Sequence, residues 1–210
     1  MRIDVFSDTV CPWCFIGKRH LQQALSETGM TDADVHWHAF QLNPDMPAGG
    51  RDRKTYLLEK FGPDAEQRIH ARLQEAGRAA GIEFQFDRIS RSPNTLDSHR
   101  LIRLAASRGR QDAAVEALFR SYFVEGQDIG DRQVLAAIAS QLDLGNDVSA
   151  WLDSPAEINT VRSEDSSARR LGITGVPFFI FEQRHALSGA QPVNVFVRAL
   201  QTVKNESIAS

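Results

Sequence analysis

The two cysteines of this chain, Cys11 and Cys14, stand in one Cys-Pro-Trp-Cys motif and are the only cysteines among its 210 residues. The loop that such a pair can close is too short to restrict the unfolded chain by much, so the pair is a poor structural staple. The motif lies between a segment that predicts a strand, about residues 2–7, and one that predicts a helix ending near Gly29. A dithiol at a strand-to-helix junction restricts the possible folds and indicates a reactive pair.

The hydrophobic pattern changes twice along the chain. Residues 35–40 alternate and predict a second strand, which completes a strand–helix–strand unit. From about residue 54 to residue 171, apolar side chains recur at helical spacing. Two short segments, 176–181 and 186–188, then predict strands, and a last helix starts near Gln191. The final unit can complete the sheet that the first unit begins.

This order of elements predicts an α/β fold in which a sheet domain is interrupted by an insertion. We expect residues 1–44 and 166–210 to form the sheet domain, and residues 45–165 to form an all-helical insertion domain. The chain is 42% hydrophobic, which is enough apolar material for a buried core.

Composition and charge argue against two classes of partner. The net charge is -3 and Lys and Arg form no run, so neither nucleic acid nor a membrane surface is an expected partner. No apolar stretch is long enough to span a bilayer. Asp4 and Asp8 interrupt the segment that would be the apolar part of a secretion signal, so we expect a cytoplasmic protein.

The position of the motif at a helix N-terminus favours different tasks for its two sulfurs. Unpaired N–H groups and the positive end of the helix dipole stabilise a thiolate there. We therefore expect Cys11 to be the accessible nucleophile and Cys14 to be the thiol that resolves a mixed disulfide. Pro12 suits the first helical turn, because its missing N–H would be unpaired there, and it is a possible modulator of the dithiol. Trp13 is expected beside the sulfurs as an apolar contact for substrate.

A second element accompanies the dithiol late in the chain. Val176 and Pro177 stand at the start of a predicted strand, where a proline is a candidate for a cis peptide bond. A cis bond would present the backbone N–H and C=O of Val176 to an extended substrate. We therefore expect these two residues to bind substrate.

Together, the two motifs resemble those of the DsbA-like thioredoxin superfamily, and the resemblance covers nearly the whole chain. Four segments are also similar to its FrnE-type branch: Cys11–Lys18, Phe40–Pro44, Asn94–Arg100 and Ser188–Pro192. The resemblance implies a thioredoxin fold and a redox-active Cys11–Cys14 disulfide with no separate cofactor. It further implies a cytoplasmic thiol–disulfide oxidoreductase that acts on proteins or small thiols.

The resemblance leaves other functions open. The same superfamily includes 2-hydroxychromene-2-carboxylate isomerases and kappa-class glutathione transferases, which carry serine where Cys11 stands and bind glutathione. A glutathione-dependent isomerase or transferase is therefore the alternative function, and glutathione is a possible substrate of the dithiol. A non-catalytic binding module, in which the dithiol would have ordinary reactivity, is a third possibility.

Several polar residues have simpler interpretations. A zinc site at the cysteines would need further ligands, for which His36 and His38 are candidates, but we expect redox chemistry and no metal. His99 is a possible modulator of the thiolate, although a structural helix histidine is the simpler interpretation. Lys18, one turn beyond Cys14, is expected to be solvated.

Overall fold

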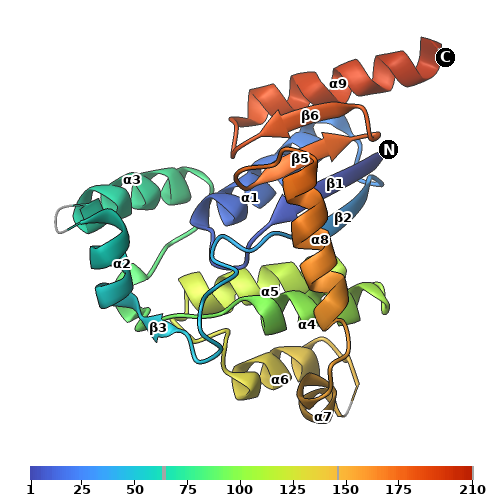
Figure 1. Ribbon diagram of the computed structural model, residues 1–210. Helices are drawn as coiled ribbons and strands as arrows, with labels where there is room; N and C mark the ends of the chain where they lie inside the picture. Colours follow the sequence, from blue (N-terminus) through green and yellow to red (C-terminus); the bar gives the residue numbers. More distant parts are fainter. Residues whose placement is uncertain (63–64, 146, 210) are drawn as a thin grey trace.

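The computed structural model describes residues 1–62, 65–145 and 147–209 (Figure 1). The strands are β1 Arg2–Ser7, β2 Asp34–Ala39, β3 Arg51–Asp52, β4 Arg91–Ser92, β5 Phe178–Phe181 and β6 His185–Ser188. The helices are α1 Pro12–Thr28, α2 Arg53–Phe61, α3 Ala65–Ala79, α4 Leu96–Ala106, α5 Gln111–Phe123, α6 Arg132–Gln141, α7 Val148–Asp153, α8 Ile158–Arg170 and α9 Val193–Ala209, with a 3-10 turn at Phe86–Arg88.

The main sheet has the strand order β2-β1-β5-β6, so the first strand of the chain lies in its interior. Strand β1 runs parallel to β2 and antiparallel to β5, and β6 runs antiparallel to β5. Ile3 lies opposite Phe181 and Phe6 lies opposite Phe178, which joins the two ends of the chain in one ladder. The structure therefore confirms the predicted α/β fold.

Alternating side chains divide the core between the two faces of the sheet. On one face Ile3 packs with α1 and α9, and Phe179 of β5 meets Phe196 of α9 edge-on, with 4.8 Å between ring centroids. On the other face Phe6 belongs to a smaller apolar cluster with Ala168 of α8. Figure 1 shows α8 crossing in front of the sheet. Burial on both faces explains why β5 is continuously apolar.

Helix α1, which carries the dithiol motif, has a well-defined start and stop. Pro12 occupies its first position, where no backbone N–H is needed. Gly29 ends it with φ of 68°, and its N–H bonds back to the last turn. A side chain is disfavoured at that left-handed position, so the glycine fixes the place where the chain leaves the helix.

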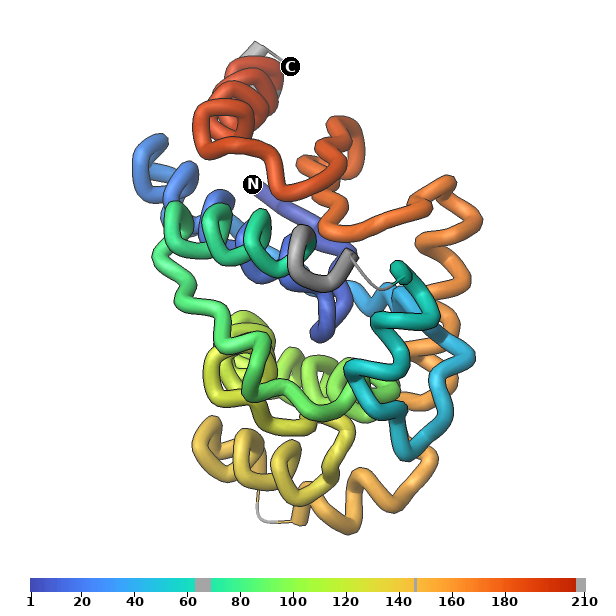
Figure 2. Tube along the Cα trace, turned by 90° about the vertical axis from the view of Figure 1, so that its left-hand side faces the viewer, coloured from blue at the N-terminus to red at the C-terminus, as the bar shows by residue number. Residues whose placement is uncertain are grey.

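The helices between β2 and β5 share a continuous core with the sheet. Phe15 of α1 stacks on Phe119 of α5, with 5.1 Å between ring centroids. Figure 2 shows α3 lying alongside α1, and the two helices are in contact. The separation of residues 45–165 as an insertion domain stays a prediction; helix α8 crosses its C-terminal boundary and contacts β2.

Two features of this region differ from the sequence-based expectation. The helical stretch contains a short antiparallel ladder, in which Arg51 of β3 lies opposite Ser92 of β4. Lys18 is not solvated: its side chain is 1% exposed, and its Nζ lies 2.9 Å from Asp112 and 3.4 Å from Glu116 of α5. A partner 94 residues away in sequence cannot be seen in a local pattern. In the described part of the chain, no helix is long and apolar enough to cross a membrane.

Candidate active site

Cys11 is the residue immediately before α1, and its sulfur takes no part in capping the helix. Its backbone has φ of -94° and ψ of 110°, the extended conformation usual before a first turn. The Sγ lies 3.6 Å from the carbonyl oxygen of Val176, to which the thiol donates. The side chain is largely buried, yet it lines the wall of a cavity. The sulfur is thus placed at a helix N-terminus, and the residue that carries it lines a cavity.

Cys14 lies in the first turn of α1 and is completely buried. Burial is the main reason why its pKa is raised well above the usual value, and the neighbouring Cys11 raises it further. The Ser7 hydroxyl and the backbone N–H of Asp8 act in the opposite direction, because both stabilise a thiolate. The two cysteines therefore occupy different environments, as expected for a nucleophile and a resolving thiol.

Val176 and Pro177 come to the dithiol from the other end of the chain. The peptide bond between them is cis, as the sequence analysis predicted. Pro177 packs against α1 at Gly17, where an added Cβ would lie 3.0 Å from the proline ring. The absence of a side chain at Gly17 lets the loop approach the helix, and this contact holds the Val176 carbonyl next to Cys11.

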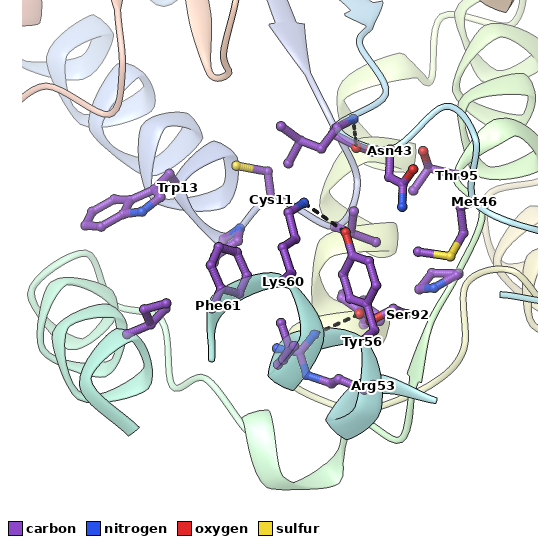
Figure 3. A pocket seen from close by; sticks show the side chains of 18 of the residues that line it. Cys11, Trp13, Asn43, Met46, Arg53, Tyr56, Lys60, Phe61, Ser92 and Thr95 are labelled. Atoms are coloured by element: carbon purple, nitrogen blue, oxygen red, sulfur yellow. Dashed lines mark hydrogen bonds between the residues drawn. The ribbon is translucent and has the colours of Figure 1, made fainter. Parts of the chain in front are cut away.

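A cavity of about 440 Å³ opens beside Cys11 (Figure 3). Pro12, Trp13 and Val176 line it beside Cys11, whereas Pro177 is not among its lining residues. The substrate-binding role of Trp13, Val176 and Pro177 stays a prediction. Trp13 also lies under the guanidinium of Arg72 from α3, 5.6 Å from the ring centroid. The opposite walls of the cavity are built by residues between β2 and β5: Leu42, Asn43, Met46, Arg53, Tyr56, Leu57, Lys60, Phe61, Ile69, His70, Leu73, Ser92, Pro93, Thr95 and Tyr122.

Helix α2 supplies a whole face of the cavity, and none of the residues on this face was predicted from the sequence as a site residue. The contributing residues are Arg53, Tyr56, Leu57, Lys60 and Phe61, which are spaced i, i+3, i+4, i+7 and i+8. That spacing is the signal of a single helix face. This face is hard to recognise in the sequence, because it mixes cations with aromatic and aliphatic residues instead of forming a purely apolar stripe.

His99 lies beneath the site and contacts it through one intermediate residue. Its Nε2 is 3.3 Å from an oxygen of Asp8, and both side chains are buried. Asp8 lines the cavity, and its second oxygen accepts the Leu42 N–H at 2.7 Å. The role of His99 as a modulator stays a prediction, with Asp8 as the group through which it would act.

The histidines considered as metal ligands have other partners. His38 bonds to Asp4 at 2.7 Å, and His36 bonds to Asp34 at 2.7 Å. Within residues 1–62, 65–145 and 147–209, no group of three or more His, Cys, Asp or Glu side chains is arranged to hold a metal ion.

One protein family matches the region that contains β1, the dithiol helix and the late cis-proline. Residues 2–201 match the family described as DSBA-like thioredoxin domain. The chain belongs to the DsbA-like thioredoxin domain family. This confirms the superfamily inferred from the motifs, whereas the closer resemblance to its FrnE-type branch stays a prediction.

Solved structures agree with this membership. A probable DsbA oxidoreductase from Streptomyces coelicolor is 32% identical, with a TM-score of 0.89 over 98% of this chain and 91% of that one. A 2-hydroxychromene-2-carboxylate isomerase has a TM-score of 0.76 at 16% identity, covering 100% of both chains. The cytosolic disulfide reductase DsbM from Pseudomonas aeruginosa, solved with GSH, has a TM-score of 0.68 at 22% identity, covering 96% of this chain and 98% of that one. The last two likenesses show a common fold.

Proposed function

We propose that this DsbA-like protein exchanges disulfides of protein or small-thiol substrates through Cys11 and Cys14. The observation that supports this most is the pairing of two unlike sulfurs. One lies at a helix N-terminus on a cavity wall, and the other is completely buried within the same turn. Such a pair provides a nucleophile and an internal resolving thiol at one site.

In the reductive direction, the Cys11 thiolate attacks one sulfur of a substrate disulfide. A bond forms between Cys11 and that sulfur, the substrate disulfide breaks, and the other substrate sulfur leaves as a thiolate. The positive end of the α1 dipole lies at Cys11 and stabilises the attacking thiolate. Because no capping hydrogen bond involves the Cys11 sulfur, attack needs no rearrangement of the helix start.

Cys14 completes the reaction. It loses its proton and attacks the Cys11 sulfur, so the Cys11–Cys14 disulfide forms and the substrate departs with two electrons from the protein. While Cys11 is free, its charge and hydrogen bond raise the pKa of Cys14. Both influences end when Cys11 enters the mixed disulfide, so Cys14 ionises more readily at that step. A small thiol can reduce the product disulfide, and the reverse sequence oxidises a substrate dithiol.

Val176 and Pro177 form the substrate-binding edge in this proposal. The Val176 carbonyl already accepts from the Cys11 thiol at 3.6 Å, so a substrate chain paired with Val176 would place its own sulfur near Cys11. Trp13 and Pro12 provide apolar contacts on the neighbouring wall.

Trapping the intermediate tests the assignment of the two sulfurs. The reduced protein is mixed with bis(2-hydroxyethyl) disulfide, and products are followed by mass spectrometry. Cys14→Ser should accumulate a mixed disulfide on Cys11, and Cys11→Ser should form none. Equal labelling of both variants would contradict the assignment. Alkylation of Cys11 at the rate of an ordinary free thiol would instead support a non-catalytic binding module.

A cytoplasmic location is part of the proposal. The DsbM structure, of similar fold, is described as that of a cytosolic disulfide reductase. Fractionation of the native cells should recover the protein in the cytoplasm with both thiols reduced; recovery from an extracytoplasmic fraction would contradict this.

A glutathione-dependent isomerase or transferase remains the alternative, favoured by the cavity between the dithiol and α2. In such an enzyme, glutathione would act as a cofactor without exchanging its sulfur with Cys11. Under this alternative, Cys11→Ser would keep full turnover of a glutathione-dependent isomerisation. Under the proposed function, the same substitution abolishes disulfide exchange.

A further inference from the structure

The cavity beside Cys11 contains two cationic side chains that have no anionic partner among the described residues. Arg53 and Lys60 both line it from α2 (Figure 3). Lys60 donates to the Tyr56 hydroxyl at 2.8 Å and lies 5.6 Å from the Phe61 ring centroid. Among the residues that the structure describes, neither cation forms an ion pair with a carboxylate.

Arg53 is held by a hydrogen bond, but one of its nitrogen atoms has no hydrogen-bond partner among the described residues. Its Nη1 donates to the Tyr122 hydroxyl at 3.1 Å, and that hydroxyl in turn donates to the Arg91 carbonyl at 3.0 Å. The guanidinium also lies 5.9 Å from the Phe86 ring centroid. Its Nε is buried and has no hydrogen-bond partner in the described part of the chain. A buried charged donor without a partner is costly. The Nε is shielded from the cavity, so an incoming anion would approach the guanidinium through its terminal nitrogens.

Among the side chains that the structure describes, none supplies the missing negative charge. Burial raises the pKa of Tyr122 to about 12, so its hydroxyl is neutral at physiological pH and donates to a carbonyl. Asp8 is the carboxylate among the residues that line the cavity, and both of its oxygens are engaged, one by the Leu42 N–H and one by His99. The positive charge of Arg53 is therefore open to an incoming ligand.

We propose that this cavity selects small disulfides and thiols that carry a carboxylate, with Arg53 as the main anchor and Lys60 as a second one. This rests on the proposed function and narrows its substrate class. A guanidinium edge matches the geometry of a carboxylate. A cavity of about 440 Å³ has the size of a small-molecule site. The apolar walls at Trp13 and Phe61 would cover the carbon chain between the carboxylate and the sulfur at Cys11.

Three small symmetrical disulfides of similar length test the charge preference. They are 3,3′-dithiodipropionate, bis(2-hydroxyethyl) disulfide and cystamine, which carry negative, no and positive charge. Each kcat/KM is divided by the rate of the same disulfide with free 2-mercaptoethanol, which removes differences in intrinsic reactivity. The wild-type protein should prefer the dianion to the neutral compound by about tenfold or more, as expected for charge-assisted hydrogen bonds. Cystamine should be the poorest substrate.

Variants assign the preference to the two cations. Arg53→Gln should raise KM for the dianion by roughly tenfold and change the neutral disulfide less than about twofold. Lys60→Gln, on an exposed side chain, should act in the same direction with a smaller effect and keeps the test valid if Arg53→Gln is unstable. Lys54→Gln removes an exposed charge of the same helix that does not line the cavity, and serves as the control. Equal values for all three disulfides in the wild type, or a uniform loss in Arg53→Gln, would overturn the proposal.

A binding measurement separates this proposal from the exchange chemistry. Suberate replaces both sulfurs of 3,3′-dithiodipropionate by methylene groups, so it can bind but cannot react. Calorimetry should show that it binds to Cys11→Ser and that adding Arg53→Gln weakens binding about tenfold, whereas 1,8-octanediol should not bind measurably. No binding of suberate would overturn the anion site. Binding of suberate without turnover of any disulfide would retain the anion site and reject the proposed exchange activity.

Discussion

At the residue scale, the contrast between the two sulfurs is the feature with the most direct chemical consequence. Burial and the neighbouring Cys11 hold the pKa of Cys14 well above its usual value. Ser7 and the Asp8 backbone are the groups that oppose this shift. Resolution by Cys14 should therefore depend on how well its thiolate is stabilised once Cys11 is bound to substrate.

Ser7→Ala tests that dependence. Removing the hydroxyl should slow the decay of the Cys11 mixed disulfide by roughly tenfold, because a charge-assisted hydrogen bond to the Cys14 thiolate is lost. It should also move the pH profile of resolution to higher pH. Rapid-quench mass spectrometry measures both effects. Ser98→Ala is the matched control, since Ser98 is equally buried but bonds to Thr9. An unchanged profile in Ser7→Ala would show that the hydroxyl has no part in this step.

Tyr122 gives a pH prediction of a different kind. Burial raises its pKa from 10.0 to about 12, so the unfolded chain releases this proton at lower pH than the folded protein does. The stability due to neutral Tyr122 should be constant below pH 10 and be lost between about pH 10 and 12, up to roughly 2–3 kcal/mol. Urea unfolding should show that the difference in free energy of unfolding between the wild type and Tyr122→Phe becomes smaller from pH 10 to pH 12. A constant difference would contradict the raised pKa.

At the element scale, the ends of α1 determine where the dithiol lies. The role of Gly29 in ending this helix can be tested by substitution. Gly29 has a positive φ, and an added Cβ would meet no atom within 4 Å. Gly29→Ala should therefore lower the free energy of unfolding by about 1 kcal/mol through backbone conformation alone. Gly49→Ala, at a glycine with equally open surroundings and no positive φ, should have little effect. Urea denaturation compares the two variants, and equal losses would contradict the explanation.

Sequence patterns could predict the elements that make up the sheet. They could not predict which residues form the cavity wall opposite the dithiol. The β1–α1–β2 unit and the late strands have strong local periodicity, and Cys11, Cys14 and the cis bond before Pro177 follow from local motifs. The far wall of the cavity depends on where the helices pack against α1, which no local pattern contains. For this reason Arg53 could not be predicted as a site residue. Its position in the cavity depends on a hydrogen bond to Tyr122, which is 69 residues away in sequence.

At the scale of the whole molecule, the sheet and the helical region share one apolar core. Phe15 on α1 stacks on Phe119 of α5, and buried Lys18 ties the same two helices by ion pairs. A continuous core favours a single cooperative transition over the separate unfolding of two domains.

Two tryptophans report on this cooperativity from opposite parts of the molecule. Trp37 lies in β2 and Trp151 in α7, so variants that retain one or the other give separate fluorescence signals. Both signals should show the same urea midpoint. Phe119→Ala should shift both midpoints equally, with a loss of roughly 3–5 kcal/mol for a large buried ring. Two distinct midpoints would support separately folding domains.

The interior position of β1 has a consequence for the order in which this protein becomes active during its synthesis. Strand β1 and the dithiol leave the ribosome before β5 and the Val176 loop, because they come earlier in the chain. Until β5 pairs with β1, the nascent chain has its thiols but neither the carbonyl beside Cys11 nor a complete sheet. The dithiol is therefore made long before the edge that we propose to bind its substrate. A nascent chain stalled before residue 176 would expose an unselective dithiol.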